Sequence, residues 1–153
     1  MANLFPEAVA DSWEVSGLDG QQSVEDGVTF GRSWRFDFEA GEFVMTPTGK
    51  IAPADEIAAW KMWCEKAIRT PRYRHVIYSR TYGQEFEELI GQGYSRAVQE
   101  SEIRRIATET LMVDPRTLSV DGFVFDWRVD ACRFTCRVKN VREDELLVEG
   151  SVT

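Results

Sequence analysis

The spacing of apolar residues changes near residue 115, and this change limits the folds open to the chain. Upstream, in residues 55–69 and 95–112, apolar side chains recur every three or four positions, which is the spacing of one buried helix face. Downstream, in residues 132–139, apolar and polar side chains alternate, which is typical of a half-buried antiparallel strand. A chain that places its helices before such strands is expected to fold as an α+β domain.

The segment before the first helix predicts a hairpin. In residues 34–45, three aromatic residues alternate with charged ones before an interruption at Ala40-Gly41, which predicts two strands with one apolar face. Asp55 is expected to cap a helix that ends near Arg69. The inward face of that helix is predicted to hold Ile57, Trp60, Cys64, Ala67 and Ile68.

Two further helices are predicted in the middle of the chain. A short one is expected around Phe86 to Ile90, stopped by the glycines that follow it. A longer one begins at Ser95 or Val98 and ends near Met112, because Pro115 cannot continue it. Its inward residues are predicted to be Ile103, Ile106, Ala107 and Leu111.

Three strands are predicted to form an antiparallel sheet at the C-terminal end, in residues 123–127, 132–139 and 146–152. Cys132, Phe134, Cys136 and Val138 are expected to share the buried face of the middle strand. The last strand has two interpretations. It lies either at a sheet edge, where it offers unpaired backbone groups to an incoming strand, or between two strands of its own sheet.

Acidic residues are concentrated at the N-terminus, where residues 1–28 hold six acids and no lysine or arginine. This segment therefore carries −6 of the chain's net charge of −8. This segment has no sustained helical or strand period, yet it contains Phe5 and Trp13. It is either a poorly ordered leader or an extended arm that lies along a neighbouring subunit, with those aromatic residues as anchors. We therefore divide the chain into an acidic arm, 1–28, and one domain, 29–153.

Composition excludes several classes of protein. A chain of 153 residues with 43% apolar residues can bury one core. It has no apolar run of the roughly 18 residues that a membrane helix needs, and its N-terminus has no basic segment followed by an apolar one, so we expect a soluble protein that is cytoplasmic when made and has no membrane partner. The cysteines Cys64, Cys132 and Cys136 fit neither a disulfide framework nor a zinc site, and no metal or cofactor is expected.

The basic segment TPRYRHVIYSRTYGQEF, residues 70–86, holds the only histidine and was tested as a catalytic centre. His75 can be paired with an acid such as Glu85 as a general base, but His75 to Tyr78 also has the pattern of a strand. The chain has no phosphate-binding loop, nucleophile elbow or metalloprotease motif, so we expect no enzymatic activity and no catalytic residue.

The same segment was tested as a nucleic-acid patch, because arginines interleaved with tyrosines can bind phosphates and stack on bases. A sequence pI near 4.8 argues against this interpretation, since duplex binders carry a basic field over a whole face. The arginines are expected instead to pair with acids of this chain or of an adjacent subunit.

Several stretches together resemble the baseplate wedge proteins of contractile phage tails, a family that shares a domain with a type VI secretion baseplate protein. These stretches are GRSWRFDF, TPTGK, YGQEFEELIG and VDPRT, and the resemblance runs from about Gly31 to the end. It is closest to the branch in PBSX-like prophages. Asp114-Pro115-Arg116 stands where the family has Glu-Pro-Arg, and the Gly-Glu-Arg element of the wider family is absent near Thr70.

The resemblance implies a non-enzymatic structural protein that links the baseplate to the first sheath ring of a phage tail, prophage particle or bacteriocin. It implies six copies around the tail axis, with other wedge proteins, the tail sheath and the tail tube or hub as partners. The C-terminal sheet is expected to resemble the interlocking domain of the sheath. The residues expected to bind partners are Asp114, Pro115, Arg116, Arg72, Arg74, Arg80 and Tyr82.

Two questions stay open from the sequence. Pro115 fixes a turn from helix into sheet, so Arg116 is held at a corner where it pairs either with an internal acid, Asp114 or Glu109, or with a carboxylate across a subunit interface. The alternative function is a small cell-wall hydrolase, because relatives have often carried a lysozyme label. That activity requires two carboxylates in a sugar-binding cleft.

Overall fold

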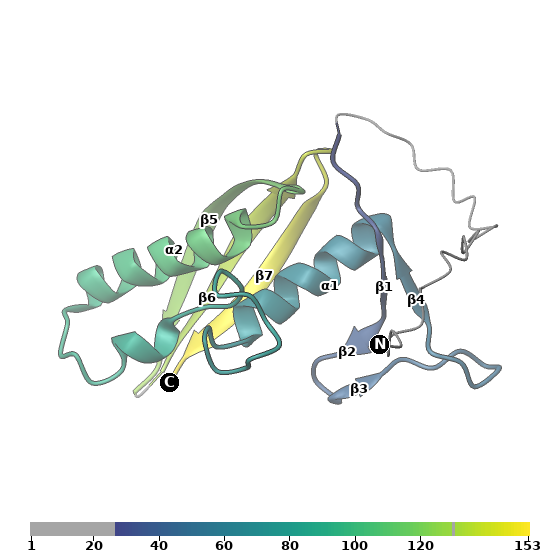
Figure 1. Ribbon diagram of the computed structural model, residues 1–153. Coiled ribbons are helices and arrows are strands. Elements are labelled where there is room, and N and C mark those ends of the chain that lie inside the picture. Colours follow the sequence, from purple (N-terminus) through teal and green to yellow (C-terminus); the bar gives the residue numbers. More distant parts are fainter. Residues whose placement is uncertain (1–26, 130) are drawn as a thin grey trace, which may run out of the picture.

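The computed structural model describes residues 27–129 and 131–153, and it has the predicted α+β architecture. Two α-helices and a short 3-10 helix lie against one face of a three-stranded antiparallel sheet, and four short strands lie beside the first helix (Figure 1). The elements are β1 (Arg32–Trp34), β2 (Phe36–Asp37), β3 (Glu42–Phe43), β4 (Pro53–Asp55), α1 (Glu56–Arg69), η1 (Phe86–Leu89), α2 (Arg96–Met112), β5 (Thr117–Trp127), β6 (Cys132–Asn140) and β7 (Glu145–Val152).

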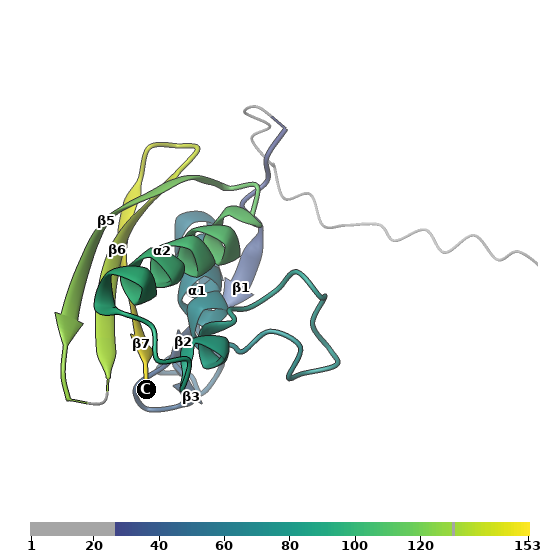
Figure 2. The same ribbon diagram turned by 90° about the vertical axis from the view of Figure 1, so that its left-hand side faces the viewer.

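The sheet has β6 in the centre, with β5 and β7 at its two edges. The predicted alternation in β6 is confirmed, because Cys132, Phe134, Cys136 and Val138 are all buried. The helices cover this face, and no described element covers the opposite one (Figure 2). The interpretation that placed the last strand between two others of its sheet is therefore wrong, since among the described strands β7 pairs with β6 alone.

The core lies between the sheet and the two helices. The predicted inward residues of α1 and α2 are buried, except that Ile57 is only partly so. Trp60 is fully buried, and its indole Nε1 donates a 3.1 Å hydrogen bond to the Thr117 hydroxyl at the start of β5. Burying one large indole with its polar atom paired ties the middle of α1 to the point where the sheet begins. Within the described residues, no helix is both long and apolar enough to cross a bilayer.

Three local expectations differ from the structure. His75 to Tyr78 does not form a strand but a series of turns, because the β-branched residues Val76 and Ile77 find no partner strand and stay exposed. The hairpin has only two paired residues on each side, Phe36 with Phe43 and Asp37 with Glu42, and its aromatic face stays outside the main core.

The third difference concerns the cap of α1. Asp55 precedes the helix as predicted, but its side chain makes no capping hydrogen bond. It accepts a 2.7 Å hydrogen bond from Nε of Arg32 instead, which links β4 to the start of β1. The predicted acidic arm lies outside the described residues apart from Gly27 and Val28.

Candidate assembly site

The Asp114-Pro115-Arg116 corner joins the end of α2 to the start of β5. Nε of Arg116 lies 2.9 and 3.1 Å from the two carboxylate oxygens of Asp114, and the backbone N–H of Arg116 also donates to that carboxylate. The side chains of Asp114 and Arg116 are only 5% and 13% exposed. Of the two pairings left open above, the described chain therefore makes the internal one, and the acid is Asp114 rather than Glu109.

Arg116 also fixes the segment that precedes β1. Its Nη1 donates a 2.6 Å hydrogen bond to the backbone carbonyl of Phe30. The Phe30 ring is buried, and the guanidinium of Arg142 lies 4.4 Å from its centroid. The corner thus connects three parts of the chain: the end of α2, the turn before β7 and the residues that lead out of the acidic segment.

The basic segment forms a loop whose two ends are held together by backbone hydrogen bonds. The N–H of Gln84 donates to the carbonyl of Thr70 at 2.9 Å, and the N–H of Arg72 donates to the carbonyl of Gln84 at 2.7 Å. Gly83 has a φ of +96°, a conformation that favours glycine. The residues between these ends project from the body of the domain (Figure 2).

Arg72 is the buried member of this loop, with a side chain that is 7% exposed. Its Nη1 lies 2.8 Å from a Glu85 oxygen and 3.2 Å from a Glu109 oxygen, and its Nε donates to the Gly83 carbonyl at 3.0 Å. Arg105 of α2 extends the network, since its Nη1 lies 3.1 Å from the other Glu109 oxygen. The Arg72 guanidinium is therefore committed to closing the loop within the chain.

The other arginines of the loop are exposed. Arg74 forms a 3.2 Å pair with Glu87 in which both side chains are more than 60% exposed, and Arg80 makes no ion pair with any residue that the structure describes. Tyr73, Val76 and Ile77 lie at the tip with exposed fractions of 67%, 101% and 85%. The tip was not predicted from the sequence, because Val76 and Ile77 were expected to lie in a strand.

Beside the loop lies a groove of about 600 Å³, called here the aromatic groove. It lies between α1, the β1–β3 segment and the base of the loop. Its aromatic lining consists of Trp34, Phe36, Phe38, Phe43, Trp63, Tyr78 and Tyr82. Arg116 also lines this groove, so the structure brings together two of the residues that were predicted to bind partners, Arg116 and Tyr82. A third, Arg72, lies instead against α2.

The Tyr82 ring lies in this aromatic lining, with its centroid 4.7 Å from that of Tyr78 in a tilted arrangement and 5.7 Å from that of Trp63 in an edge-to-face one. Its hydroxyl is buried and makes no hydrogen bond of good geometry with any described residue. Burial raises the pKa of this hydroxyl, and the nearby Thr70 hydroxyl only partly offsets the rise. Tyr82 is therefore a neutral, inward-facing residue and not an acid–base group.

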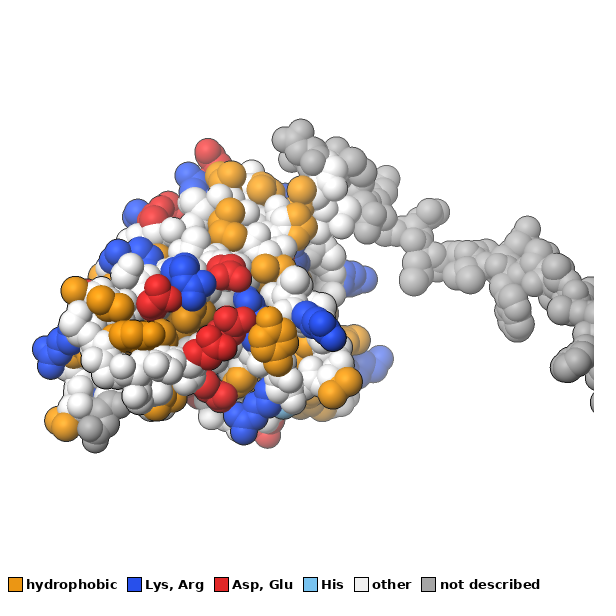
Figure 3. Space-filling model, turned by 60° about the vertical axis from the view of Figure 1, so that its left-hand side comes forward, with side chains coloured by type: hydrophobic (Ala, Val, Ile, Leu, Met, Phe, Trp, Pro, Cys, Tyr) orange, Lys and Arg blue, Asp and Glu red, His pale blue; other side chains and the backbone are white. Residues whose placement is uncertain are grey.

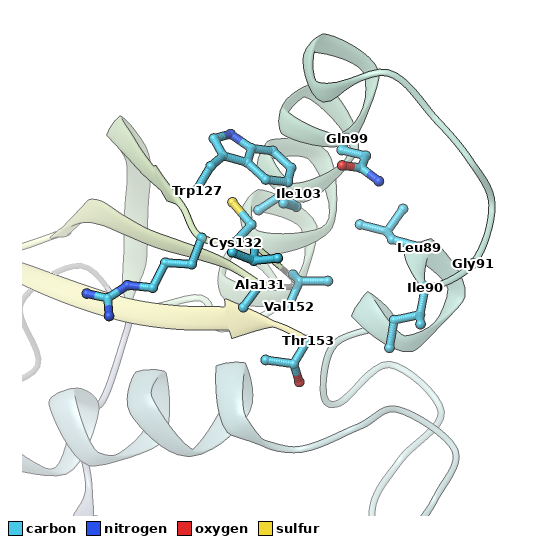
Figure 4. A pocket seen from close by; sticks show the side chains of 12 residues that line it. Leu89, Ile90, Gly91, Gln99, Ile103, Trp127, Ala131, Cys132, Val152 and Thr153 are labelled. Atoms are coloured by element: carbon cyan, nitrogen blue, oxygen red, sulfur yellow. The ribbon is translucent and has the colours of Figure 1, made fainter.

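A second, smaller cavity of about 240 Å³ lies where the β5–β6 turn, the C-terminus and the end of η1 meet (Figure 4). Its walls include Leu89, Ile103, Trp127 and Cys132. Burial raises the pKa of the Cys132 thiol, so this thiol is protonated and a poor nucleophile at neutral pH. Among the described residues that line this cavity, there is no pair of side chains suited to acid–base catalysis.

On the face shown in Figure 3, acidic and basic side chains are interspersed with hydrophobic ones. Arg105, for example, lies between Glu102 and Glu109 on α2. Among the described residues, no group of three or more histidine, cysteine or acidic side chains could hold a metal ion. The arrangement is suited to contacts with other proteins through loops and strand edges.

Comparison with protein families supports the structural interpretation of the chain. Residues 32–144 match the family described as the contractile injection system sheath initiator. The chain belongs to this sheath initiator family. Its role is structural, in sheath initiation by a contractile injection system, and the baseplate family predicted from the sequence is confirmed. No curated protein matches the chain.

The matched span of this sheath initiator contains the loop, the aromatic groove and the Asp114-Pro115-Arg116 corner. It ends at residue 144, immediately before β7, and begins at the first residue of β1. The loop, the groove and the corner therefore belong to the part of the chain that the family shares, whereas Phe30 and β7 lie outside it.

Proposed function

We propose that this sheath initiator links the baseplate to the first sheath ring without enzymatic activity, in six copies around the tail axis. In this proposal β7 accepts an extended segment of a sheath subunit, while the loop and the corner face baseplate wedge proteins. The single observation that carries the proposal is the position of β7 at the edge of a sheet with only one covered face. Such an edge offers backbone donors and acceptors to another strand.

The two edges of the sheet differ in regularity. β7 pairs with β6 over eight consecutive residue pairs without a register shift. β5 pairs with β6 with shifts between Thr117 and Ser119 and between Asp121 and Val124, and Gly122 has a φ of +63°. Bulges disrupt the regular hydrogen-bonding pattern and protect an edge from strand addition. An incoming strand is therefore expected at β7 rather than at β5.

A hollow beside β7 provides space for such a strand. It measures about 460 Å³ and is lined on one side by Leu147 and Glu149 of β7, and on the other by α1 and the β2–β3 hairpin. A paired strand lies about 4.8 Å from its neighbour. Leu147 is 66% exposed, so it offers an apolar side chain to an added strand.

The baseplate side is assigned to the loop and the corner. Arg74 and Arg80 are exposed cations near the exposed tip residues, and Pro115 is exposed at the corner. These residues and the rim of the groove at Tyr82 are proposed to contact acidic and apolar surfaces of wedge proteins. Asp114, Arg116 and Arg72 act by holding these surfaces in place through the internal pairs described above.

An edge substitution with a matched control tests the strand proposal. Leu147→Lys places a charge at the β7 edge, and Leu118→Lys makes the same change on β5, where Leu118 is 52% exposed. Because both sites are exposed, each variant is expected to remain folded. We expect Leu147→Lys to leave bare tubes on baseplates in negative-stain images, and Leu118→Lys to give normal tails. Sheathed tails from a folded Leu147→Lys variant would contradict the assignment.

The absence of enzymatic activity and the prophage branch need their own tests. Purified protein is expected to leave a cell-wall suspension turbid, and clearing that one carboxylate-to-amide change abolishes would establish the hydrolase alternative. The GRSWRFDF and VDPRT stretches support the PBSX-like branch. Co-expression with neighbouring tail genes, followed by affinity purification, is expected to recover a wedge complex that contains this chain.

A further inference from the structure

We propose that, in the free protein, the acidic segment 1–26 occupies the aromatic groove of its own chain. This is an intramolecular docking site that goes beyond the role in sheath initiation. The occupant is a segment with six acids, no basic residue and two aromatic anchors, Phe5 and Trp13.

The groove has the chemistry to bind such a segment. Seven of its thirteen lining residues are aromatic, and two of them, Trp34 and Phe43, are 57% and 47% exposed. Three lining residues are cationic and none is acidic. A site with aromatic walls and cations at its rim is complementary to a segment in which aromatic and acidic residues are close neighbours.

Of the three cations in the groove lining, Lys66 is the one without an ion pair among the described residues. Arg116 is paired with Asp114 and Arg32 with Asp55, whereas Lys66 makes no salt bridge with any described residue. Its Nζ lies 5.0 Å from the Tyr78 ring centroid, over the aromatic wall. A carboxylate from the segment can therefore bind Lys66 while its aromatic neighbour enters the groove.

The buried Tyr82 hydroxyl is a second, independent indication. It lies in the groove lining and makes no hydrogen bond of good geometry within the described part of the chain. Buried polar atoms are nearly always paired, so a hydroxyl whose contact with the neighbouring Thr70 hydroxyl is poorly aligned favours a further acceptor at the groove. A carboxylate or backbone carbonyl of the segment would accept a hydrogen bond from this hydroxyl.

Connectivity favours the segment of the same chain over that of a second copy. β1 lines the groove at Arg32 and Trp34. In the sequence, the acidic segment is joined to β1 through Phe30, whose backbone carbonyl accepts a hydrogen bond from Arg116. The residues from Trp13 to Gly27 can span at most roughly 50 Å, which is ample for a return to the groove. Tethering raises the effective concentration to the millimolar range without the cost of joining two molecules.

Docking of this segment would protect the domain before assembly. Exposed aromatic residues promote non-specific association, and an occupied groove shields Trp34 and Phe43 until a baseplate partner displaces the segment.

A spin label on the segment tests the proposal in the full chain. The three native cysteines are buried, so Ser12→Cys provides the accessible thiol for a nitroxide label. In ¹⁵N-labelled protein, we expect the indole N–H signals of Trp34 and Trp63 to lose most of their intensity. The signal of Trp127, which lines the other cavity, should be unaffected. The loss should reverse in 1 M salt, where the Debye length is about 3 Å.

Charge variants and isotope mixing complete the test. Lys66→Glu should restore the Trp34 and Trp63 signals, whereas Lys61→Glu, on the same helix but outside the groove lining, should not. Equal intensities for all tryptophan signals outside the segment would overturn the proposal. Loss of the Trp34 signal when a spin-labelled, unenriched chain is mixed with a ¹⁵N-labelled chain would also overturn it, in favour of a second copy as the source of the segment.

Discussion

Arg116 donates a 2.6 Å hydrogen bond to the carbonyl oxygen of Phe30, a residue 86 positions earlier in the chain. The same guanidinium is held by Asp114, so one side chain connects the helix-to-sheet corner to the root of the N-terminal segment. Pro115 sets the backbone between the two paired residues. In this sheath initiator, the Asp-Pro-Arg signature therefore organises its own chain.

Arg116→Ala is expected to destabilise the domain by about 3–5 kcal/mol, because it leaves the Asp114 carboxylate buried without its partner. Urea unfolding of the purified variant measures this loss. The double variant Asp114→Ala, Arg116→Ala should lose less than the sum of the single changes, since neither charge is then left alone. Additive losses would show that the two side chains act independently.

Arg72→Lys is expected to cost about 1.5–3 kcal/mol, although it conserves the charge. Lysine has no rigid fork, so it cannot bind Glu85, Glu109 and the Gly83 carbonyl together. Arg74→Lys is the matched control in the same loop. Its exposed pair with Glu87 contributes about 0–1 kcal/mol at most, so little change is expected. Equal thermal midpoints for the two variants would contradict the assigned role of Arg72.

Gly83→Ala is expected to open the loop. A Cβ atom there would lie 2.5 Å from the Thr70 carbonyl oxygen, and the φ of +96° disfavours any side chain. We expect a loss of about 1–3 kcal/mol and faster amide hydrogen exchange at Arg72 and Gln84. Gly91→Ala is the control, because it also has positive φ but has open space around it. Similar exchange rates at Arg72 in both variants would count against a closed loop.

The buried thiol of Cys136 is expected to make stability fall in alkaline solution. Burial, with a contribution from the Asp121 carboxylate, raises its pKa from 9.0 to about 12. The thiol is therefore largely protonated in both states well below pH 9, and its stabilising effect is lost as pH rises from about 9 towards 12. The expected slope is about 1.4 kcal/mol per pH unit for this group.

Cys136→Ala isolates that effect. The variant is expected to be less stable than the natural chain at pH 8, because the substitution leaves a small cavity, but its unfolding free energy should decline less between pH 9 and 11. Denaturant unfolding at several pH values makes the comparison. Parallel curves for the two proteins would show that Cys136 ionises equally in the folded and unfolded states.

Some features could be predicted because their cause is local. The alternation from Cys132 to Val138 predicts a strand whatever lies beside it. Asp114 and Arg116 are two positions apart, so their pairing also depends only on local sequence. The contact of Arg116 with Phe30 could not be predicted, because it depends on a backbone carbonyl far away in sequence. The aromatic groove was missed for a similar reason, since its walls come from four separate segments.

The error at His75 to Tyr78 has a different physical origin. Val76 and Ile77 have high strand propensity, but propensity reflects packing against neighbours, and here no strand lies alongside. Local sequence gives no sign of that absence. The hairpin was overestimated for the same reason, because Trp34 pairs with Pro53 of β4 rather than continuing β2.

The closed ends of the loop make its tip a suitable place for a reporter. Because Thr70 and Gln84 are joined by a backbone hydrogen bond, a small tag inserted between Val76 and Ile77 lengthens a loop whose base is already closed. Such a tag leaves the core segments in their original order. It is therefore expected to leave the domain folded, so that any loss of assembly can be assigned to the tip. A fluorophore bound there would mark the moment at which each copy enters the particle.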